Sequence, residues 1–151
     1  MKMIKHLSKY IFLDVDGVLN NKDWQPIDPK NVENLKYIID NTGAKIVLSS
    51  SWRKIENRKD SFSWKCLNKY FQDYNLSIYS ETPQIYEPDR GFEILKWLED
   101  KKDYKFCVID DTFEDSFRKY ELTKFFVKTD WNTGLTKEDA EKAIKILSKT
   151  T

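Results

Sequence analysis

The chain has 151 residues, and its 26 lysines and arginines against 25 acidic residues leave a formal net charge of +1. This length suits one domain, residues 1–151, with a substantial buried core. The near-neutral charge excludes a global field that would recruit nucleic acid or an anionic membrane, so any phosphate recognition has to come from a local site. No apolar run approaches membrane-spanning length.

Three features of the sequence limit the location and the chemistry of the protein: its cysteines, its N-terminal segment and its single histidine. Cys66 and Cys107 lack metal-site spacing, which favours a reduced, intracellular chain. Residues 1–9 are basic, but only about four apolar residues follow before Asp14, too few for a signal peptide. The only histidine, His6, precedes the first predicted strand, which argues against Ser-His-Asp hydrolysis and histidine metal sites. We expect a soluble, cytoplasmic protein.

The first part of the chain alternates an apolar run with a helical pattern. Tyr10–Leu13 predicts a buried strand. Asp28-Pro29 supplies an N-cap and a first-turn proline, so a helix should begin there and end at Thr42-Gly43. Ala44–Leu48 directly follows that glycine and predicts a second buried strand.

The rest of the chain continues the alternation up to a final helix with a capping box, Thr136 and Asp139. The predicted order is a loop or ragged helix start at 54–61, a helix at Phe62–Tyr74, a strand at Leu76–Tyr79, a helix from Arg90, strands at Tyr104–Ile109 and Phe125–Val127, and the helix from Thr136. This order predicts a three-layer α/β fold with a mostly parallel central sheet.

Polar residues gather where the predicted strands end, and parallel strands bring these ends to one edge of the sheet. The set is Asp14 and Asp16 after the first strand, Ser49 and Ser50 after the second, Asp110 and Asp111 after the fourth, and Arg90 before the fourth. Carboxylates favour Mg²⁺, and a hydroxyl with a guanidinium can hold a phosphoryl group. Lys105 is a competing cation, but it lies at a strand start, which is the wrong end of the sheet.

These motifs resemble those of the haloacid dehalogenase superfamily of phosphotransferases. The segment 14–18, Asp-Val-Asp-Gly-Val, resembles the first motif, and the apolar run ending at Ser50 resembles the second. Arg90 occupies the place of the third motif, which is usually lysine, and Asp110-Asp111 that of the fourth. The resemblance covers residues 10–135 and implies a Rossmann-like fold. The short segment after Asp16 predicts a minimal cap or none.

The resemblance implies a two-step phosphoryl transfer that uses Mg²⁺. Asp14 is the implied nucleophile and Asp16 the implied acid and base. The implied metal ligands are Asp14, the backbone carbonyl of Asp16, and Asp110 or Asp111, with Asp115 as an outer contact. Ser49 or Ser50, with Arg90, would bind the phosphoryl oxygens.

A narrower resemblance concerns the substrate. The segments 48–53, 90–98 and 129–136 look like the phosphatase-like domain of Swiss Army Knife RNA-repair proteins, a group related in style to polynucleotide kinase-phosphatases. This resemblance and the open site favour a phosphorylated nucleic-acid terminus. Trp24, Trp52 and Arg53 are the candidate substrate contacts, whereas Trp64 and Trp131 are also compatible with core or rim positions.

Other functions fit parts of the pattern. A small-metabolite or protein phosphatase would share the same catalytic residues. A receiver-type phosphoacceptor domain also has paired acids, but its phosphorylated aspartate follows the third strand, whereas here Asp-x-Asp comes first. A catalytically idle binding module would not need both Asp14 and Asp16. The oligomeric state is left open.

Overall fold

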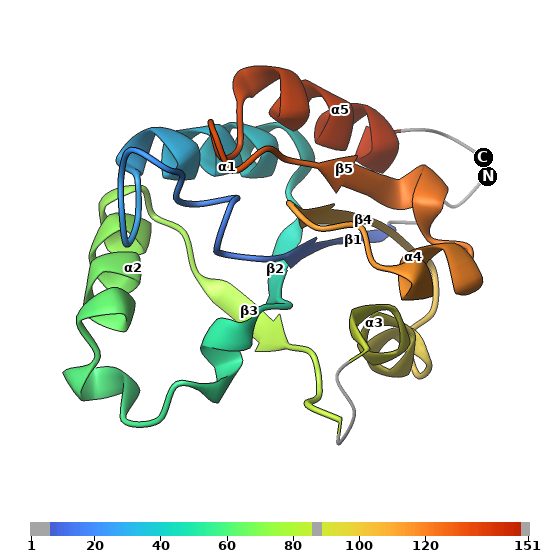
Figure 1. Cartoon of the computed structure of the whole chain (residues 1–151). Coiled ribbons are helices and arrows are strands. Elements are labelled where there is room, and N and C mark those ends of the chain that lie inside the picture. Colours follow the sequence, from blue (N-terminus) through green and yellow to red (C-terminus); the bar gives the residue numbers. More distant parts are fainter. Residues whose placement is uncertain (1–6, 86–88, 149–151) are drawn as a thin grey trace.

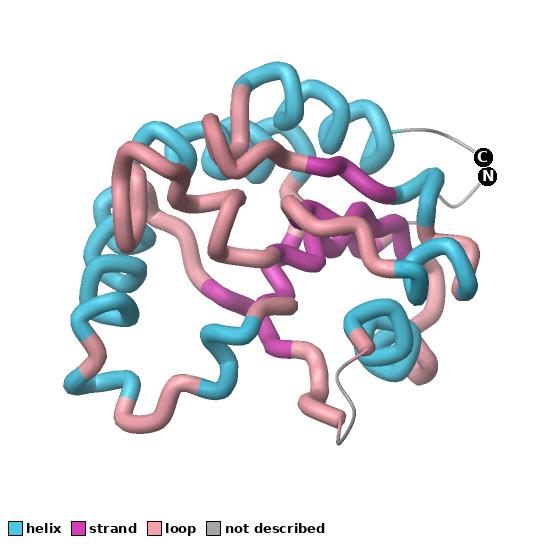
Figure 2. Tube along the Cα trace, viewed as in Figure 1, coloured by secondary structure: helices cyan, strands magenta, loops and turns pink. Residues whose placement is uncertain are grey.

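The structure, a computed structural model, describes residues 7–85 and 89–148. Five parallel strands form one sheet in the order β3-β2-β1-β4-β5 (Figures 1 and 2). The strands are β1 Ser8–Leu13, β2 Lys45–Leu48, β3 Ile78–Glu81, β4 Tyr104–Asp110 and β5 Phe126–Lys128. The helices are α1 Pro29–Thr42, α2 Phe62–Asp73, α3 Arg90–Leu98, α4 Asp115–Lys119 and α5 Lys137–Ser148. This architecture confirms the predicted α/β class.

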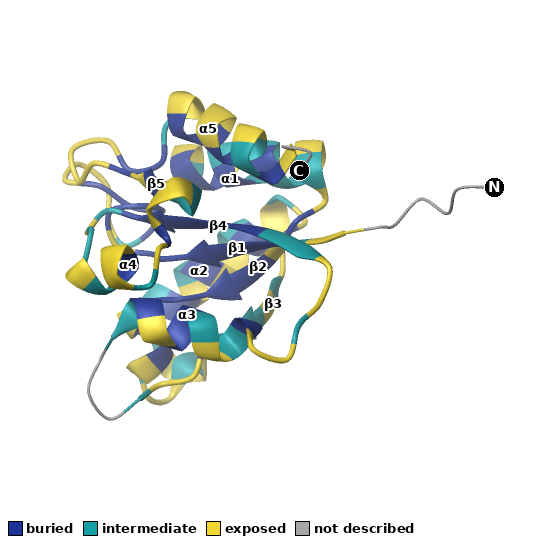
Figure 3. Cartoon of the chain, turned by 90° about the vertical axis from the view of Figure 1, so that its right-hand side faces the viewer, coloured by how far each residue is buried: buried dark blue, intermediate teal, exposed yellow. Residues whose placement is uncertain are grey.

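Helices cover both faces of the sheet because successive strand residues point to opposite sides. In β1, Ile11 and Leu13 join a core cluster with α1, α2 and α5, while Tyr10 and Phe12 join a second cluster with α3 and α4. Strands β1, β2 and β4 are therefore largely buried on both faces, as Figure 3 shows in dark blue. This explains their continuous apolar sequence.

The predicted ends of α1 and the predicted start of α5 are confirmed. The Asp28 side chain accepts a hydrogen bond from the Lys30 N–H, and Gly43 ends α1 at φ 69°, in the left-handed region. Before α5, the Thr136 N–H donates to Asp139 at 3.0 Å, and the Asp139 N–H donates to the Thr136 hydroxyl at 3.1 Å. These short-range bonds were predictable because each involves residues at most three positions apart.

Several predicted boundaries were wrong. Strand β3 begins at Ile78 because Leu76 takes part in the C-terminal cap of α2. Asn75 has φ 55°, and the Leu76 N–H bonds the Phe71 carbonyl at 2.7 Å. Strand β5 starts one residue late, after a 3₁₀ turn at Thr123–Phe125. The segment 54–61, predicted as a loop or ragged helix start, agrees with the structure: it is a loop that contains parts of two 3₁₀ turns, at Ser51–Lys54 and Arg58–Asp60. Helix α4 was not predicted, because five residues with one buried side chain give no periodic signal.

No cap domain separates the strand ends from solvent within the described residues. Residues 17–28 form a short excursion closed by an isolated bridge between Asn21 and Trp24. Helix α2, between β2 and β3, packs into the main core. The extent of the domain, residues 1–151, stays a prediction. No helix in the described ranges is long and apolar enough to span a membrane.

Candidate active site

Asp14 directly follows β1 and lies at the C-terminal ends of the strands, between the ends of β2 and β4. The Asp14 N–H bonds the Ile109 carbonyl at 3.0 Å, and the Ser49 N–H bonds the Leu13 carbonyl at 2.8 Å, so the three strands end level with one another. The Asp14 side chain is buried, and one of its oxygens accepts the Val15 N–H at 2.8 Å. The backbone thus fixes this carboxylate in place.

Three carboxylates converge at this edge. Asp14, Asp110 and Asp111 each present an oxygen, and these oxygens lie within 4.8 Å of one another. Gly17 makes this possible: a Cβ at that position would lie 2.2 Å from Asp111 Oδ2, and its φ of 78° also favours glycine. The motif glycine therefore makes room for the fourth-motif acid.

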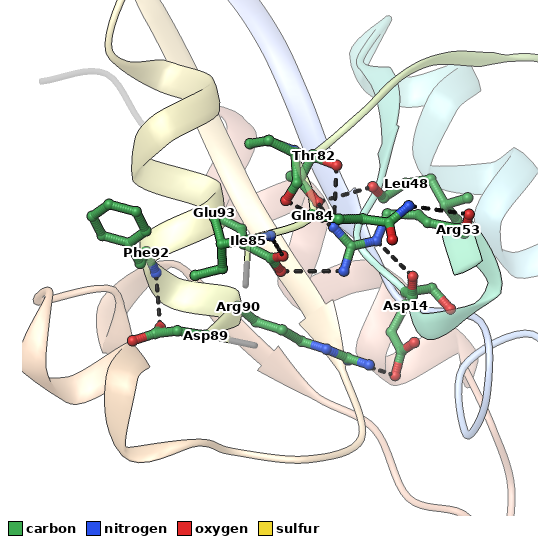
Figure 4. Close-up of polar contacts among 12 residues, drawn as sticks. Asp14, Leu48, Arg53, Thr82, Gln84, Ile85, Asp89, Arg90, Phe92 and Glu93 are labelled. Carbon is green, nitrogen blue, oxygen red and sulfur yellow. Dashed lines mark hydrogen bonds and ion pairs between the residues drawn. The ribbon is translucent and has the colours of Figure 1, made fainter. Parts of the chain in front are cut away.

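Arg90, at the first turn of α3, pairs with two of these acids. Its Nη1 lies 3.1 Å from Asp14 Oδ2 (Figure 4). The same nitrogen also binds Asp110 Oδ2. Burial raises the pKa of Asp14 despite the opposing effect of Arg90. Burial and the neighbouring Asp14 raise the pKa of Asp110 to about 8. For Arg90, burial acts to lower the pKa, but the two carboxylates outweigh it and the pKa is raised.

The donor set fits a hard divalent cation. Three carboxylates lie together, and Arg90 pairs with two of them, Asp14 and Asp110. One guanidinium cannot balance three carboxylate charges, and burial makes each of these charges costly. Mg²⁺ is a hard cation that binds oxygen ligands, and carboxylates are among its usual protein ligands. Asp14, Asp110 and Asp111 are therefore the residues that could hold the ion.

Asp16 is the exposed member of the first acid pair. Its Oδ1 accepts hydrogen bonds from the Asn20 amide at 2.9 Å and from the Trp52 indole N–H at 3.2 Å. Trp52 was predicted as a substrate contact, but the residue is only 6% exposed and its ring packs against Trp64. The structure assigns Trp52 to the support of Asp16 because burial leaves little ring surface for a ligand.

Ser49 and Ser50 both lie at the end of β2 and are buried. The Ser50 hydroxyl caps the following 3₁₀ turn by accepting the Trp52 N–H at 3.1 Å. This turn places the Ser50 side chain and the Trp52 indole on the same short loop. The structure therefore brings the second motif next to the first.

Arg53 does not have the position expected of a substrate contact. Its side chain is 3% exposed, and its nitrogens donate to the Thr82 carbonyl and to Glu93 (Figure 4). They also donate to the Ser50 and Pro83 carbonyls. With all three guanidinium nitrogens bonded inside the protein, Arg53 joins the ends of β2 and β3 to α3. The prediction for Arg53 is corrected on this ground.

The other candidates lie at different places. Trp24 is 45% exposed on the short excursion after β1, so its predicted substrate contact stays open to test. Asp115 is exposed at the first residue of α4 and is not part of the acid cluster. Lys105 pairs in register with Lys9, at the opposite end of the sheet from Asp14. His6 lies outside the described residues.

Three polar side chains at the site were missed from the sequence. The Asn20 amide oxygen accepts the Gly17 N–H at 2.8 Å, and the Thr129 hydroxyl donates to the Gly17 carbonyl at 2.7 Å. Glu114 accepts the Arg90 N–H at 3.2 Å. Asn20 could have been found from its position four residues after Asp16. Thr129 and Glu114 act across long sequence separations that no local pattern shows.

The fold and this site together define the haloacid dehalogenase superfamily. Residues 10–140 match the model of the family described as the HAD domain in Swiss Army Knife RNA repair proteins, so the chain belongs to this family. No match was found among curated proteins or among solved structures. Domains of this superfamily generally use a divalent metal ion, and membership indicates a phosphohydrolase with a phosphorylated substrate.

Proposed function

We propose that this protein is a Mg²⁺-dependent phosphatase that works through an aspartyl-phosphate intermediate. The observation that carries the proposal is the sharing of Arg90 Nη1 between Asp14 and Asp110 beside the three-carboxylate cluster. A guanidinium at this point can hold a phosphoryl oxygen next to the Asp14 carboxylate. It also orients that carboxylate before substrate arrives.

In the first step, an Asp14 oxygen attacks phosphorus and the bond to the leaving oxygen breaks. Asp16 donates its proton to that oxygen. In the second step, Asp16 takes a proton from water, the water oxygen bonds phosphorus, and the Asp14–phosphorus bond breaks. Mg²⁺ held by Asp14, the Asp16 carbonyl, and Asp110 or Asp111 would offset the repulsion between carboxylate and phosphate.

The positions of Asp14 and Asp16 support these different roles. Asp14 is buried and held by the Val15 N–H and Arg90, which suits a nucleophile that must be aimed. Asp16 is exposed and held from one side by Asn20 and Trp52, which leaves it accessible to a leaving group and to water. Ser50 and Arg90 are the proposed contacts to the phosphoryl oxygens.

A phosphorylated nucleic-acid terminus is the proposed substrate. The lack of a cap in the described residues leaves the strand ends open to the end of a polymer, and exposed Trp24 lies on the excursion that follows Asp16. An aromatic ring in this place can stack on a terminal base. Small metabolites and phosphoproteins are the alternatives for the same chemistry.

Hydrolysis of an aryl phosphate tests the proposed reaction. The wild-type protein should turn over the substrate with Mg²⁺ and lose activity in EDTA. Asp14→Asn should abolish turnover, while Asp23→Asn should not, because Asp23 is an exposed acid outside the cluster. Undiminished turnover by a folded Asp14→Asn variant would exclude Asp14 as the nucleophile.

The substrate class needs a separate comparison. We expect a higher kcat/KM for a 3′- or 5′-phosphorylated oligonucleotide than for the matching mononucleotide or for sugar phosphates. Trp24→Ala should reduce this preference without changing turnover of the aryl phosphate. A clear preference for sugar phosphates would replace the nucleic-acid proposal with a metabolite phosphatase.

A further inference from the structure

A lysine-rimmed aromatic hollow lies at the end of the sheet opposite the acid cluster. Its volume is about 780 Å³, and it opens between the starts of β4 and β5 and the last turns of α5. The lining residues are Tyr104, Lys105, Phe106, Lys124, Phe125, Phe126, Lys142, Lys145 and Ile146. Four of the nine are lysines and none is acidic, although the whole chain carries a net charge of only +1.

The lysines are available to a ligand. Among the described residues, none of the four has an ion pair within 4.0 Å, and the one contact shown is Lys124 Nζ over the Phe125 ring at 5.3 Å. Lys124, Lys142 and Lys145 are exposed. The α5 acid one turn before Lys145, Glu141, instead accepts the Tyr37 hydroxyl. Positive charge therefore stays concentrated around the hollow.

The floor of the hollow consists of aromatic rings held by their neighbours. Phe125 packs on Phe106 with a centroid distance of 4.5 Å, and Phe126 packs on Phe113 at 5.2 Å. Phe125 and Phe126 both line the hollow and are only partly buried. Because these rings are already held in place, stacking a planar group on them would cost little side-chain conformational entropy.

We propose that this hollow binds single-stranded nucleic acid without sequence preference. Flexible lysines on three elements suit successive backbone phosphates, and partly exposed phenylalanines suit stacked bases. A dedicated nucleotide pocket would need groups that read a base edge, and Tyr104 is the only lining residue with an uncharged polar side chain. The hollow is concave, whereas insertion into an anionic bilayer calls for protruding apolar groups.

The hollow is a site separate from the proposed active site. Tyr104 and Asp110 mark the two ends of β4, about 20 Å apart at strand geometry. Binding there does not require Mg²⁺, a phosphorylated end or Asp14. The inference therefore goes beyond the proposed phosphatase activity, and each can fail without the other.

Fluorescence anisotropy tests the site. The probe is a labelled 12-nucleotide oligothymidylate with hydroxyl ends, and the buffer contains EDTA, so that neither a phosphorylated end nor Mg²⁺ is present. Lys142→Glu/Lys145→Glu should weaken binding about tenfold and reduce the salt slope by about 1.4, since each lost phosphate contact removes about 0.7. The matched control is Lys59→Glu/Lys65→Glu, which makes the same charge change at exposed lysines around α2 and should bind like wild type. If both double variants lost affinity to the same extent, the loss would come from the net charge of the protein and not from the hollow. That result would overturn the proposal.

A base-free polyanion separates stacking from charge. The wild-type protein should prefer oligothymidylate to polyphosphate of equal charge, and Phe125→Leu should lower that preference while binding polyphosphate as before. Tighter binding to phosphatidylserine vesicles than to oligothymidylate, or equal affinity for both polyanions, would overturn the nucleic-acid assignment. Aryl phosphate turnover should be unchanged in all these variants, and the melting temperature reports their folding.

Discussion

Two arginines, one buried and one partly exposed, lie near the ends of the central strands, and their contacts differ. Arg53 spreads its three guanidinium nitrogens over carbonyls, a hydroxyl and one carboxylate. Arg90 makes both of its ion pairs, to Asp14 and Asp110, through a single nitrogen. Its side chain is 20% exposed, against 3% for Arg53.

From this difference we infer a structural role for Arg53 and propose a catalytic role for Arg90. All three guanidinium nitrogens of Arg53 donate to groups inside the protein, so its removal should affect folding. Arg90 faces two acids whose pKa values are raised chiefly by burial, and it keeps donors for an incoming phosphoryl oxygen. Residue type alone did not distinguish them, because the sequence shows only an arginine after β2 and another at the start of α3.

Truncation of each arginine should give the largest contrast. Arg53→Ala leaves Glu93 buried without its cation and should lower the free energy of unfolding by about 3–5 kcal/mol. Arg90→Ala should lower kcat/KM by about 10²–10³-fold, as expected for loss of a transition-state donor. Urea unfolding and aryl phosphate kinetics measure the two effects. The comparison fails if Arg53→Ala is as stable as wild type or if Arg90→Ala keeps full activity.

Substitution by lysine sharpens the same contrast. Arg90→Lys should keep most of the activity, because one ammonium can replace the single nitrogen that contacts Asp14 and Asp110. Arg53→Lys should cost at least about 2 kcal/mol of stability, because one ammonium cannot replace three donor nitrogens and hydrogen bonds to charged groups contribute about 1.5–3 kcal/mol each. Stable Arg53→Lys with inactive Arg90→Lys would reverse the assignment.

Trp52→Phe should have the smallest effect. It removes the 3.2 Å hydrogen bond to Asp16 and keeps most of the packing. If this hydrogen bond stabilises the transition state by about 1 kcal/mol, its loss would lower kcat about fivefold. The effect should be larger for an alkyl phosphate than for nitrophenyl phosphate, because a poor leaving group depends more on the acid. An equal effect on both substrates would mean that Trp52 supports the fold rather than Asp16.

The sequence was sufficient for features set by short-range patterns. Apolar runs predicted the strands, and nearby residues predicted the helix caps at Asp28, Gly43 and Thr136. The acids could be placed because each follows the end of a predicted strand. Since parallel strands end at one edge, the convergence of Asp14 with Asp110 could also be expected. These features together predicted both the fold class and the acid cluster.

The sequence was not sufficient where burial and long-range partners decide. Arg53 and Trp52 were expected at the substrate because polar and aromatic residues beside a site are common contacts, but the fold buries both. Thr129 reaches Gly17 across 112 positions, and no local spacing encodes that bond. The lysine hollow likewise combines residues from β4, the start of β5 and α5 that look like ordinary surface charges in sequence.

Chemical trapping tests the central claim, that Asp14 carries the phosphoryl group. The Asp16→Asn variant, which should slow release of the intermediate, is mixed with Mg²⁺ and aryl phosphate and quenched with borohydride. Borohydride reduces an acyl phosphate to an alcohol, so peptide mass spectrometry should find homoserine at position 14. Trapping at another carboxylate, or none during measurable turnover, would contradict the account.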